Sequence, residues 1–490
     1  MPPGFSVLDF YYLLPELVLT SGALVLLIVN VMVSQKSQSL LMWLALGIVV
    51  MTGASMLPLA GVNVTVARGL MAVDTFAFFF KIIFLVAAAL TILMSSRYLE
   101  VENARFGEYY FLILCATLGM MVMTGAVDLI AIFIGLETMA VSFYVLVGYL
   151  KPSRRSNEAA VKYFLLGAFS LGILLYGLSI LYGLTGTTNL HGIMEVLDSS
   201  DVSPVLLLGM VLVIAGVGFK VAAVPFHMWA PDVYEGAPTP VTAFLSVGSK
   251  AASFAMVLRI FQEALPGLKD EWQSMFWLLA VLTMTVGNIS ALTQSNLKRM
   301  LAYSSIAHAG YILMGVAVGT PWGIQAMLIY LAVYVFMQLG AFAVVVMMRR
   351  KDIVGDELKD LSGLYFRNPI AAIAMLLFLL SLGGIPPTAG FMGKFWLFGA
   401  SIDAGFYWLA IIAVANSAIS LYYYIRVVVF MWMKEEAGGS PIVVQPALAV
   451  TLVIGVVGTV LLGIYPAPLF DFAEMSARSL GMVRLAAGIP

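Results

Sequence analysis

The stretch Gly218–Pro240 reads GFKVAAVPFHMWAPDVYEGAPTP and continues an apolar run that begins near residue 204. The run predicts a helix, and Pro225 interrupts it because proline removes a backbone hydrogen bond. Lys220 lies about one and a half turns before this proline. Lipid tolerates such a break only where it is buried in protein or lines a wet cavity. The stretch therefore predicts a broken membrane helix that places a lysine inside a helix bundle.

The composition of the whole 490-residue chain also predicts a membrane protein. Hydrophobic residues make up 62% and charged residues 10%, whereas soluble domains have about 25% charged residues. At about 20 residues per helix, the apolar residues suffice for up to about 15 membrane spans. We therefore expect a polytopic integral membrane protein.

The same counts exclude several classes of function. The net charge is −1 without a large basic cluster, so nucleic-acid binding has no electrostatic basis. Cys115 is the single cysteine and cannot form an internal disulfide, an iron–sulfur cluster or a cysteine-rich zinc site. The three histidines have no paired metal or haem-ligand spacing, and no glycine-rich phosphate motif follows a strand. We expect no cofactor or metal in this chain, which would transport something across a bilayer or support a protein that does.

The apolar segments predict fourteen transmembrane helices in an all-α fold. They are expected near residues 10–33, 40–60, 73–96, 108–124, 128–150, 157–183, 204–227, 239–262, 272–293, 297–318, 321–348, 369–399, 404–433 and 441–464. The loops on the side of the N-terminus would hold four Lys and Arg residues, and those on the opposite side fourteen. Because positive loops stay in the cytoplasm, both termini are expected on the non-cytoplasmic side.

A second proline break lies in the twelfth helix, at Pro386 and Pro387. The two breaks are five helices apart, and five is odd, so equivalent helices would cross the membrane in opposite directions. This spacing predicts two inverted five-helix repeats, as in many ion carriers. The expected divisions are residues 1–107 (three helices), 108–262 and 263–433 (the repeats) and 434–490 (a C-terminal helix and tail). Two unrelated kinks are the alternative.

Four ionisable residues fall inside predicted helices: Glu137, Lys220, Lys250 and Lys394. A charge at the bilayer centre costs at least about 2.5–3.5 kcal/mol on insertion scales and is usually functional. Glu137 could instead only neutralise a lysine, and Lys220 and Lys394 could be held by carbonyl groups freed at the breaks. Lys250 has no acidic residue on its own helix before Glu263, so a local ion pair does not explain it.

Lysine suits the movement of protons. Burial weakens its hold on a proton, and a nearby carboxylate strengthens it. If Glu137 lies about 7 Å from Lys220 at an effective dielectric near 20, their attraction is roughly 2.4 kcal/mol. Moving or neutralising the carboxylate would then shift Lys220 between holding and releasing a proton. Sodium would need a cage of several oxygen ligands, and a single carboxylate is predicted in the interior.

For other ionisable residues in the helices, the sequence indicates a functional role less strongly. Lys162 lies near the start of the sixth helix and could extend to the surface. His308 lies in the tenth helix beside two serines and could relay protons or be structural. Asp74 and Lys81 are seven residues apart, which favours stabilisation within one helix. Arg259 is expected to reach the surface from a helix end.

Two stretches resemble a known family. The sequence of residues 218–240 and the sequence GIPPTAGFMGKF of residues 384–395 are similar to those of proton-translocating membrane subunits of respiratory complex I and of cation/proton antiporters. The likeness covers nearly the whole chain. Within the family it is closest to the N-type subunits. Lys394 occupies a position where M-type subunits have glutamate. The residues of the second stretch are also typical of the N-type. The fourteenth span is not followed by the long lateral helix of the L-type.

The resemblance implies roles for the buried residues. Glu137 and Lys220 would be a coupled pair, Lys250 the central relay, and Lys394 the group that leads toward the exit. The resemblance implies a subunit of the NADH-quinone oxidoreductase that moves protons from the cytoplasm to the outside, coupled to electron transfer to quinone. A cation/proton antiporter subunit and a non-conducting scaffold are the alternatives.

The resemblance also implies what surrounds the chain. NADH, flavin, iron–sulfur clusters and quinone would belong to partner subunits of the enzyme. The partners would be an M-type neighbour, small membrane subunits and lipids of the bacterial inner membrane. Lys162 and His308 fall where the family has further polar groups of the same axis.

Overall fold

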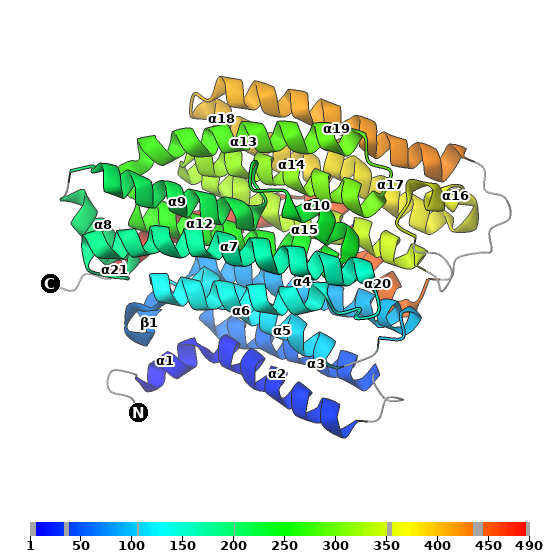
Figure 1. Cartoon of the computed structure of the whole chain (residues 1–490), viewed down its shortest axis with the longest axis horizontal. Helices are drawn as coiled ribbons and strands as arrows, with labels where there is room; N and C mark the ends of the chain where they lie inside the picture. The colour runs from blue at the N-terminus through cyan, green and yellow to red at the C-terminus, as the bar shows by residue number, and fades with distance from the viewer. Residues whose placement is uncertain are drawn as a thin grey trace.

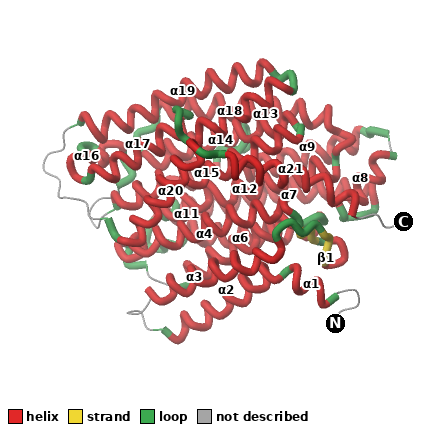
Figure 2. The backbone as a smooth tube through the Cα atoms, turned by 180° about the vertical axis from the view of Figure 1, so that it is seen from behind, coloured by secondary structure: helices red, strands yellow, loops and turns green. Residues whose placement is uncertain are grey.

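The computed structural model describes residues 6–33, 39–104, 107–199, 201–349, 355–434 and 444–486, with side chains up to residue 480. Residues 441–443, at the start of the predicted fourteenth span, lie outside this part. The described chain is almost entirely helical, as Figure 2 shows. Its long helices run side by side along one direction, and both termini lie at the same end of the bundle (Figure 1). We call this the terminal end, and the end at which the short helix α16 (Leu364–Arg367) lies the opposite end.

The all-α membrane fold is confirmed. Thirteen helices in the described chain are long and apolar enough to cross a membrane. They are α2 (Leu14–Met32), α3 (Ser39–Met56), α4 (Thr75–Val101), α5 (Glu108–Gly125), α6 (Leu129–Val147), α7 (Arg154–Thr185), α9 (Pro204–Val221), the continuous span Thr239–Ala264, α13 (Lys269–Leu292), α14 (Leu297–Val318), α15 (Pro321–Met348), α19 (Tyr407–Met433) and α20 (Pro446–Ile464). A further pass is divided between α17 (Pro369–Gly383) and α18 (Ala389–Asp403), which agrees with fourteen spans.

The eighth span is not a uniform α-helix. It consists of α11 (Thr239–Phe244), the π-turn η4 (Leu245–Ser249), α12 (Lys250–Leu258) and the π-turn η5 (Arg259–Ala264). Turns of π-helix are rare and are frequent at functional sites. Nothing in the sequence pattern predicted these turns.

The remaining elements are short or lie at the ends of the spans. They include α1 (Val7–Tyr12), α8 (Leu190–Asp198), α10 (Trp229–Gly236), α21 (Ala467–Ala486) and an antiparallel hairpin of β1 (Val64–Val66) and β2 (Met71–Val73) that pairs Thr65 with Ala72. The helix α21 packs against α4 and α15. It occupies the segment that the sequence analysis treated as a tail.

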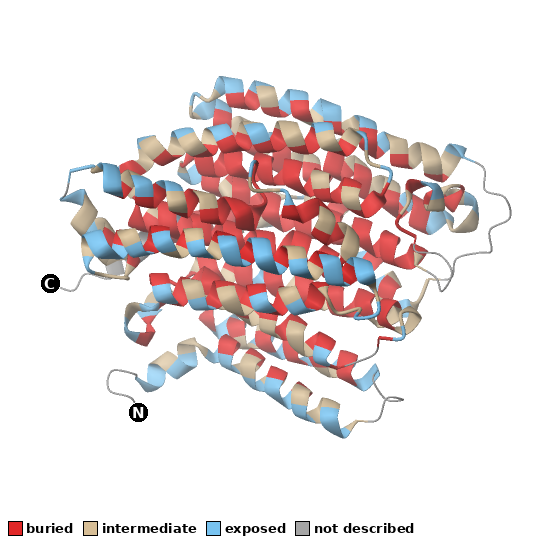
Figure 3. Ribbon diagram, in the orientation of Figure 1, coloured by how far each residue is buried: buried red, intermediate tan, exposed pale blue. Residues whose placement is uncertain are grey.

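The core lies along the middle of the bundle. The span Thr239–Ala264, α14 and α15 are buried on all sides, whereas α2 and α20 expose much of their surface (Figure 3). The exposed faces are apolar, as at Leu24, Ile28 and Val31 of α2. Apolar outer faces suit lipid, so the polar residues of the central helices are separated from lipid by protein.

The two helix breaks have the same local geometry. The chain leaves α9 at Ala222 and α17 at Gly384, with φ angles of 60° and 84°. Each of these residues donates its N–H to the carbonyl groups three and four residues earlier. This left-handed cap ends a helix and satisfies part of its free carbonyls. The shared geometry of the two breaks agrees with the inverted repeat, which stays a prediction.

Two expectations about charged residues were wrong. Arg259 is completely buried and forms ion pairs with Asp74 at 2.7 Å and Glu263 at 2.6 Å. Lys81 pairs with Glu16 of α2 at 2.5 Å, so Asp74 and Lys81 bind different partners. Their partners come from other spans or from the π-turn, which spacing along one helix does not reveal. A buried arginine is tolerated when carboxylates pair with its charge.

Candidate functional site

His308 lies at the centre of the bundle between two tyrosine hydroxyls. Its Nδ1 is 2.6 Å from the Tyr330 hydroxyl of α15, and its Nε2 is 3.0 Å from the Tyr424 hydroxyl of α19. Tyr424 also shares a hydrogen bond of 2.5 Å with Ser304, one turn before the histidine. The His308 side chain is 1% exposed. Because both ring nitrogens contact groups that donate and accept, a proton can pass through the ring by exchange with the hydroxyls.

Lys250 contacts α14, the helix that carries His308. It directly follows the π-turn η4 and donates hydrogen bonds to the backbone carbonyl of Ser305 and, at 2.6 Å, to the Ser305 hydroxyl. Its amine also lies 6.0 Å from the ring of Tyr334, and that ring lies 5.2 Å from the ring of His308. Lys250 has no acidic partner in the described chain, which agrees with the sequence argument that no local ion pair explains it.

Lys394 is held at the second helix break. Its amine donates to the carbonyls of Leu382 and Gly383 at 3.0 and 3.1 Å and to the Ser417 hydroxyl at 2.9 Å. It also lies 4.8 Å from the ring of Tyr311 on α14. The expected binding by freed carbonyls is therefore present at Lys394. It fixes the amine beside α14 without a counter-charge in contact.

The central residues form one buried row. Ser305, His308 and Tyr311 follow each other at intervals of three along α14, and they contact Lys250, the two tyrosines and Lys394 in turn. We call Lys250, His308 and Lys394 the central row. The row brings together three of the residues that the sequence analysis selected.

Lys220 and Glu137 lie outside this row. Lys220 ends α9 with 5% exposure, and its amine has no hydrogen-bond partner in the described chain. One oxygen of Glu137 on α6 is likewise buried without a partner. Their side chains form no ion pair within 4 Å. The coupling of the two residues stays a prediction, and Lys220, unlike Lys394, does not bind the carbonyls of its break.

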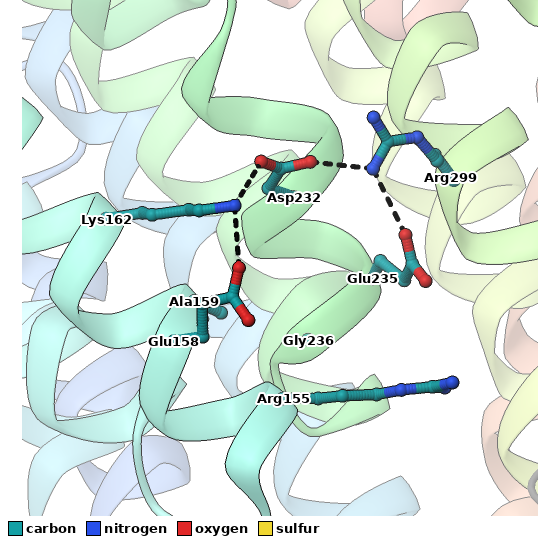
Figure 4. A pocket seen from close by; sticks show the side chains of 8 residues that line it. All are labelled: Arg155, Glu158, Ala159, Lys162, Asp232, Glu235, Gly236 and Arg299. Atoms are coloured by element: carbon teal, nitrogen blue, oxygen red, sulfur yellow. Dashed lines mark hydrogen bonds and ion pairs between the residues drawn. The ribbon is translucent and has the colours of Figure 1, made fainter.

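Lys162 belongs to a charged cavity of about 280 Å³ that Figure 4 shows. It forms ion pairs with Glu158 at 2.9 Å and with Asp232 of α10 at 2.8 Å. Asp232 also binds Arg299 of α14 at 2.7 Å, and Arg299 binds Glu235 at 3.1 Å. Lys162 is 42% exposed, so it lies at the edge of the bundle and not in the central row.

Several residues of the site were not selected from the sequence. They are Ser305, Tyr330, Tyr334 and Tyr424 beside the central row and Asp232, Glu235 and Arg299 at the cavity. A tyrosine inside an apolar helix is a weak signal, because its ring also suits a hydrophobic core. The acids of α10 follow the break directly, and this position was the available signal. The described chain has no cluster of three or more His, Cys, Asp or Glu that could hold a metal.

Comparison with known proteins gives a consistent result. Residues 126–420 match the family described as NADH:quinone oxidoreductase/Mrp antiporter, TM. The chain is 48% identical to NADH-quinone oxidoreductase subunit N of Trichlorobacter lovleyi, over 97% of this chain and 98% of that protein. It is 46% identical to subunit N 2 of Rhizobium meliloti, over 94% and 96% of the two chains.

Solved structures have the same fold. A chain of respiratory complex I from Thermus thermophilus superposes with a TM-score of 0.80 at 33% identity, covering 93% of this chain and 98% of that one. A chain of the Mrp complex from a Dietzia species superposes with a TM-score of 0.86 at 22% identity, covering 99% and 100%. The second likeness shows the fold alone.

Proposed function

Because this chain belongs to the NADH-quinone oxidoreductase subunit N family, we propose that its buried lysines carry protons through the membrane part of that enzyme. The chain is an antiporter-like, proton-translocating membrane subunit of the complex. The central row is the observation that carries the proposal for its residues. It places two lysines from separate predicted repeats beside one helix, α14, with His308 and its hydroxyl partners between their contact points.

Each residue has a distinct role in this proposal. Lys220 accepts a proton, and its readiness to do so depends on the charge of Glu137. Lys250 receives the proton next, and the Ser305 hydroxyl and His308 pass it along α14. Lys394 releases it at the second break. Since none of the three lysines contacts a carboxylate, a positive charge on one raises the cost of protonating the next.

The charged cavity supports proton uptake at the same side as Lys220. Asp232 and Glu235 follow the first break on α10 and accept ion pairs from α7 and α14. The negative charges of Asp232 and Glu235 would attract protons from the cytoplasm to this cavity, and Lys162 and Arg299 hold these acids in place. Lys162 is in this role a positioning residue at the mouth of the route.

The proposal extends to the surroundings of the subunit. We place it in a bacterial inner membrane with the opposite end facing the cytoplasm and both termini outside. An M-type neighbour, small membrane subunits and lipids would adjoin it. NADH, flavin, iron–sulfur clusters and quinone would act in partner subunits, which supply the energy for the proton movement.

The test uses the assembled complex in proteoliposomes. Lys220→Ala and Glu137→Ala are expected to lower proton translocation per NADH oxidised while the complex still assembles. Full translocation in both variants would refute the proposal. A lower yield of assembled complex with normal translocation in the assembled fraction would point to a scaffold. Sodium-dependent pH changes without NADH oxidation would point to antiport.

A further inference from the structure

One face of α15 continues beyond the central row. Tyr330, Tyr334 and Gln338 lie on successive turns, four residues apart, and are at most 1% exposed. Tyr330 binds His308, and the ring of Tyr334 lies beside both His308 and the Lys250 amine. Gln338 is one turn closer to Met348, where α15 ends. The face therefore leads from the row toward the opposite end of the bundle.

Gln338 is the unusual member of this face. Its side chain is completely buried, and neither the oxygen nor the nitrogen of its amide has a partner in the described chain. Burying an amide without hydrogen bonds costs several kcal/mol, roughly 2–7 depending on the reference state. Native proteins satisfy most buried polar side chains with protein groups or ordered water. Water is the small molecule that can both donate to the oxygen and accept from the nitrogen.

One helix that packs against α15 carries a further buried polar group. The helix α4 packs against α15, and the π-turn η4, directly before Lys250, packs against both. On α4, Thr91 is completely buried and its hydroxyl has no partner in the described chain. Thr91 and Gln338 each lie just past the middle of helices that cross the bundle in the same direction. A buried water requires about two to four polar partners. The Gln338 amide offers two polar atoms, and Thr91 offers a third at a similar depth of the bundle.

We infer that Gln338 holds water that extends the row from Lys250 toward the opposite end of the bundle, between α4, η4 and α15. That end carries charged residues, among them Arg349, which pairs with Glu102 at 2.5 Å. The inference rests on the proposed function and adds a second supply of protons to Lys250 that does not pass through Lys220. Gln338 is a positioning residue, because it orients the water and does not itself titrate.

Gln338→Leu in the assembled complex tests this inference. Leucine has a similar volume and removes an amide that is costly when unsatisfied, so thermal stability should stay equal or rise. Proton translocation per NADH oxidised should nevertheless fall, and Gln338→Glu, which keeps a polar group that binds water, should restore it. A merely structural glutamine would give the stability change without the loss of translocation.

The control is Gln325→Leu on the same helix. Gln325 donates to the Phe470 carbonyl at 3.1 Å, far from Gln338 along α15, and its loss should leave translocation unchanged. Lys250→Ala is measured in parallel to separate two failures. If Lys250→Ala loses translocation and Gln338→Leu does not, the inference about Gln338 falls and the proposed function stands. If Lys250→Ala translocates fully, the proposed function itself falls.

A second measurement does not depend on the variants folding. A density map of the wild-type complex that resolves ordered water is expected to show water within hydrogen-bond distance of the Gln338 amide. The density should continue toward Lys250. An amide that contacts only apolar side chains in such a map would overturn the inference.

Discussion

The amine of Lys394 lies 3.1 Å from the carbonyl oxygen of Gly383 and donates a hydrogen bond to it. Lys394 comes eleven residues after this glycine, so the side chain of α18 closes back onto the end of α17. At the first break the lysine precedes the proline, and the Lys220 amine has no hydrogen-bond partner in the described chain. The two breaks share their backbone geometry and differ in how firmly they hold a lysine.

Gly384→Ala should displace Lys394. A Cβ at this position would lie 2.9 Å from Cδ of Lys394, and the φ angle of 84° is strained for any L-residue. The strain costs about 1–2 kcal/mol, and the clash moves the Lys394 amine away from its three hydrogen-bond acceptors. We expect lower thermal stability of the complex and lower proton translocation per NADH oxidised.

Gly405→Ala is the matched control for that variant. Its φ angle is 82°, and nothing lies within 4 Å of the added Cβ. The backbone strain is therefore the same, but Lys394 is untouched. Equal translocation in the two alanine variants would show that the position of the Lys394 amine does not matter.

Much of the fold could be predicted from the sequence, because apolar runs and proline breaks are local signals. Pro225 and Pro386 marked the broken helices, and both breaks lie where they were expected. The four selected residues are also interior or partly interior. Contacts between helices could not be predicted from local patterns, because the hydrogen bond from Lys250 to Ser305 joins residues 55 apart in sequence. Arg259 was misjudged for the same reason, since Asp74 approaches from another span.

Tyr424→Phe should disturb the central row. The change leaves His308 Nε2 and the Ser304 hydroxyl without their shared partner. An unsatisfied buried polar group costs about 1–3 kcal/mol, so the thermal midpoint of the complex should fall. Proton translocation should fall as well, because one side of the imidazole ring loses its exchange partner.

The neighbouring Tyr423→Phe serves as the comparison. Tyr423 donates at 2.9 Å to the Asn288 amide oxygen, whereas the hydroxyl partners of His308 are Tyr330 and Tyr424. We expect a similar loss of stability with translocation preserved. If both tyrosine variants retain full translocation, the hydroxyl of Tyr424 has only a structural role.

Arg259→Met should be strongly destabilising. The substitution leaves Asp74 and Glu263 buried together without the guanidinium that pairs with both. Removing one partner of a buried ion pair costs about 3–5 kcal/mol. The amount of assembled complex and its thermal midpoint measure the effect. Arg478→Met, which breaks an exposed pair with Glu474, should change stability by less than about 1 kcal/mol. Similar effects of the two changes would contradict the burial of the cluster.

Asp232→Asn should slow proton uptake with little effect on stability. Asp232 joins Lys162 of α7 to Arg299 of α14 at the rim of the charged cavity, where its side chain is 33% exposed. Ion pairs at such exposure contribute about 1 kcal/mol or less, so the complex should assemble normally. The amide cannot carry a proton at neutral pH, and the initial rate of proton translocation in proteoliposomes should fall. Glu158→Gln removes a more exposed carboxylate that binds only Lys162 at this cavity, and it should leave that rate unchanged. A fall of equal size in both variants would mean that the cavity acts through its total charge, and Asp232 would then have no special part in uptake.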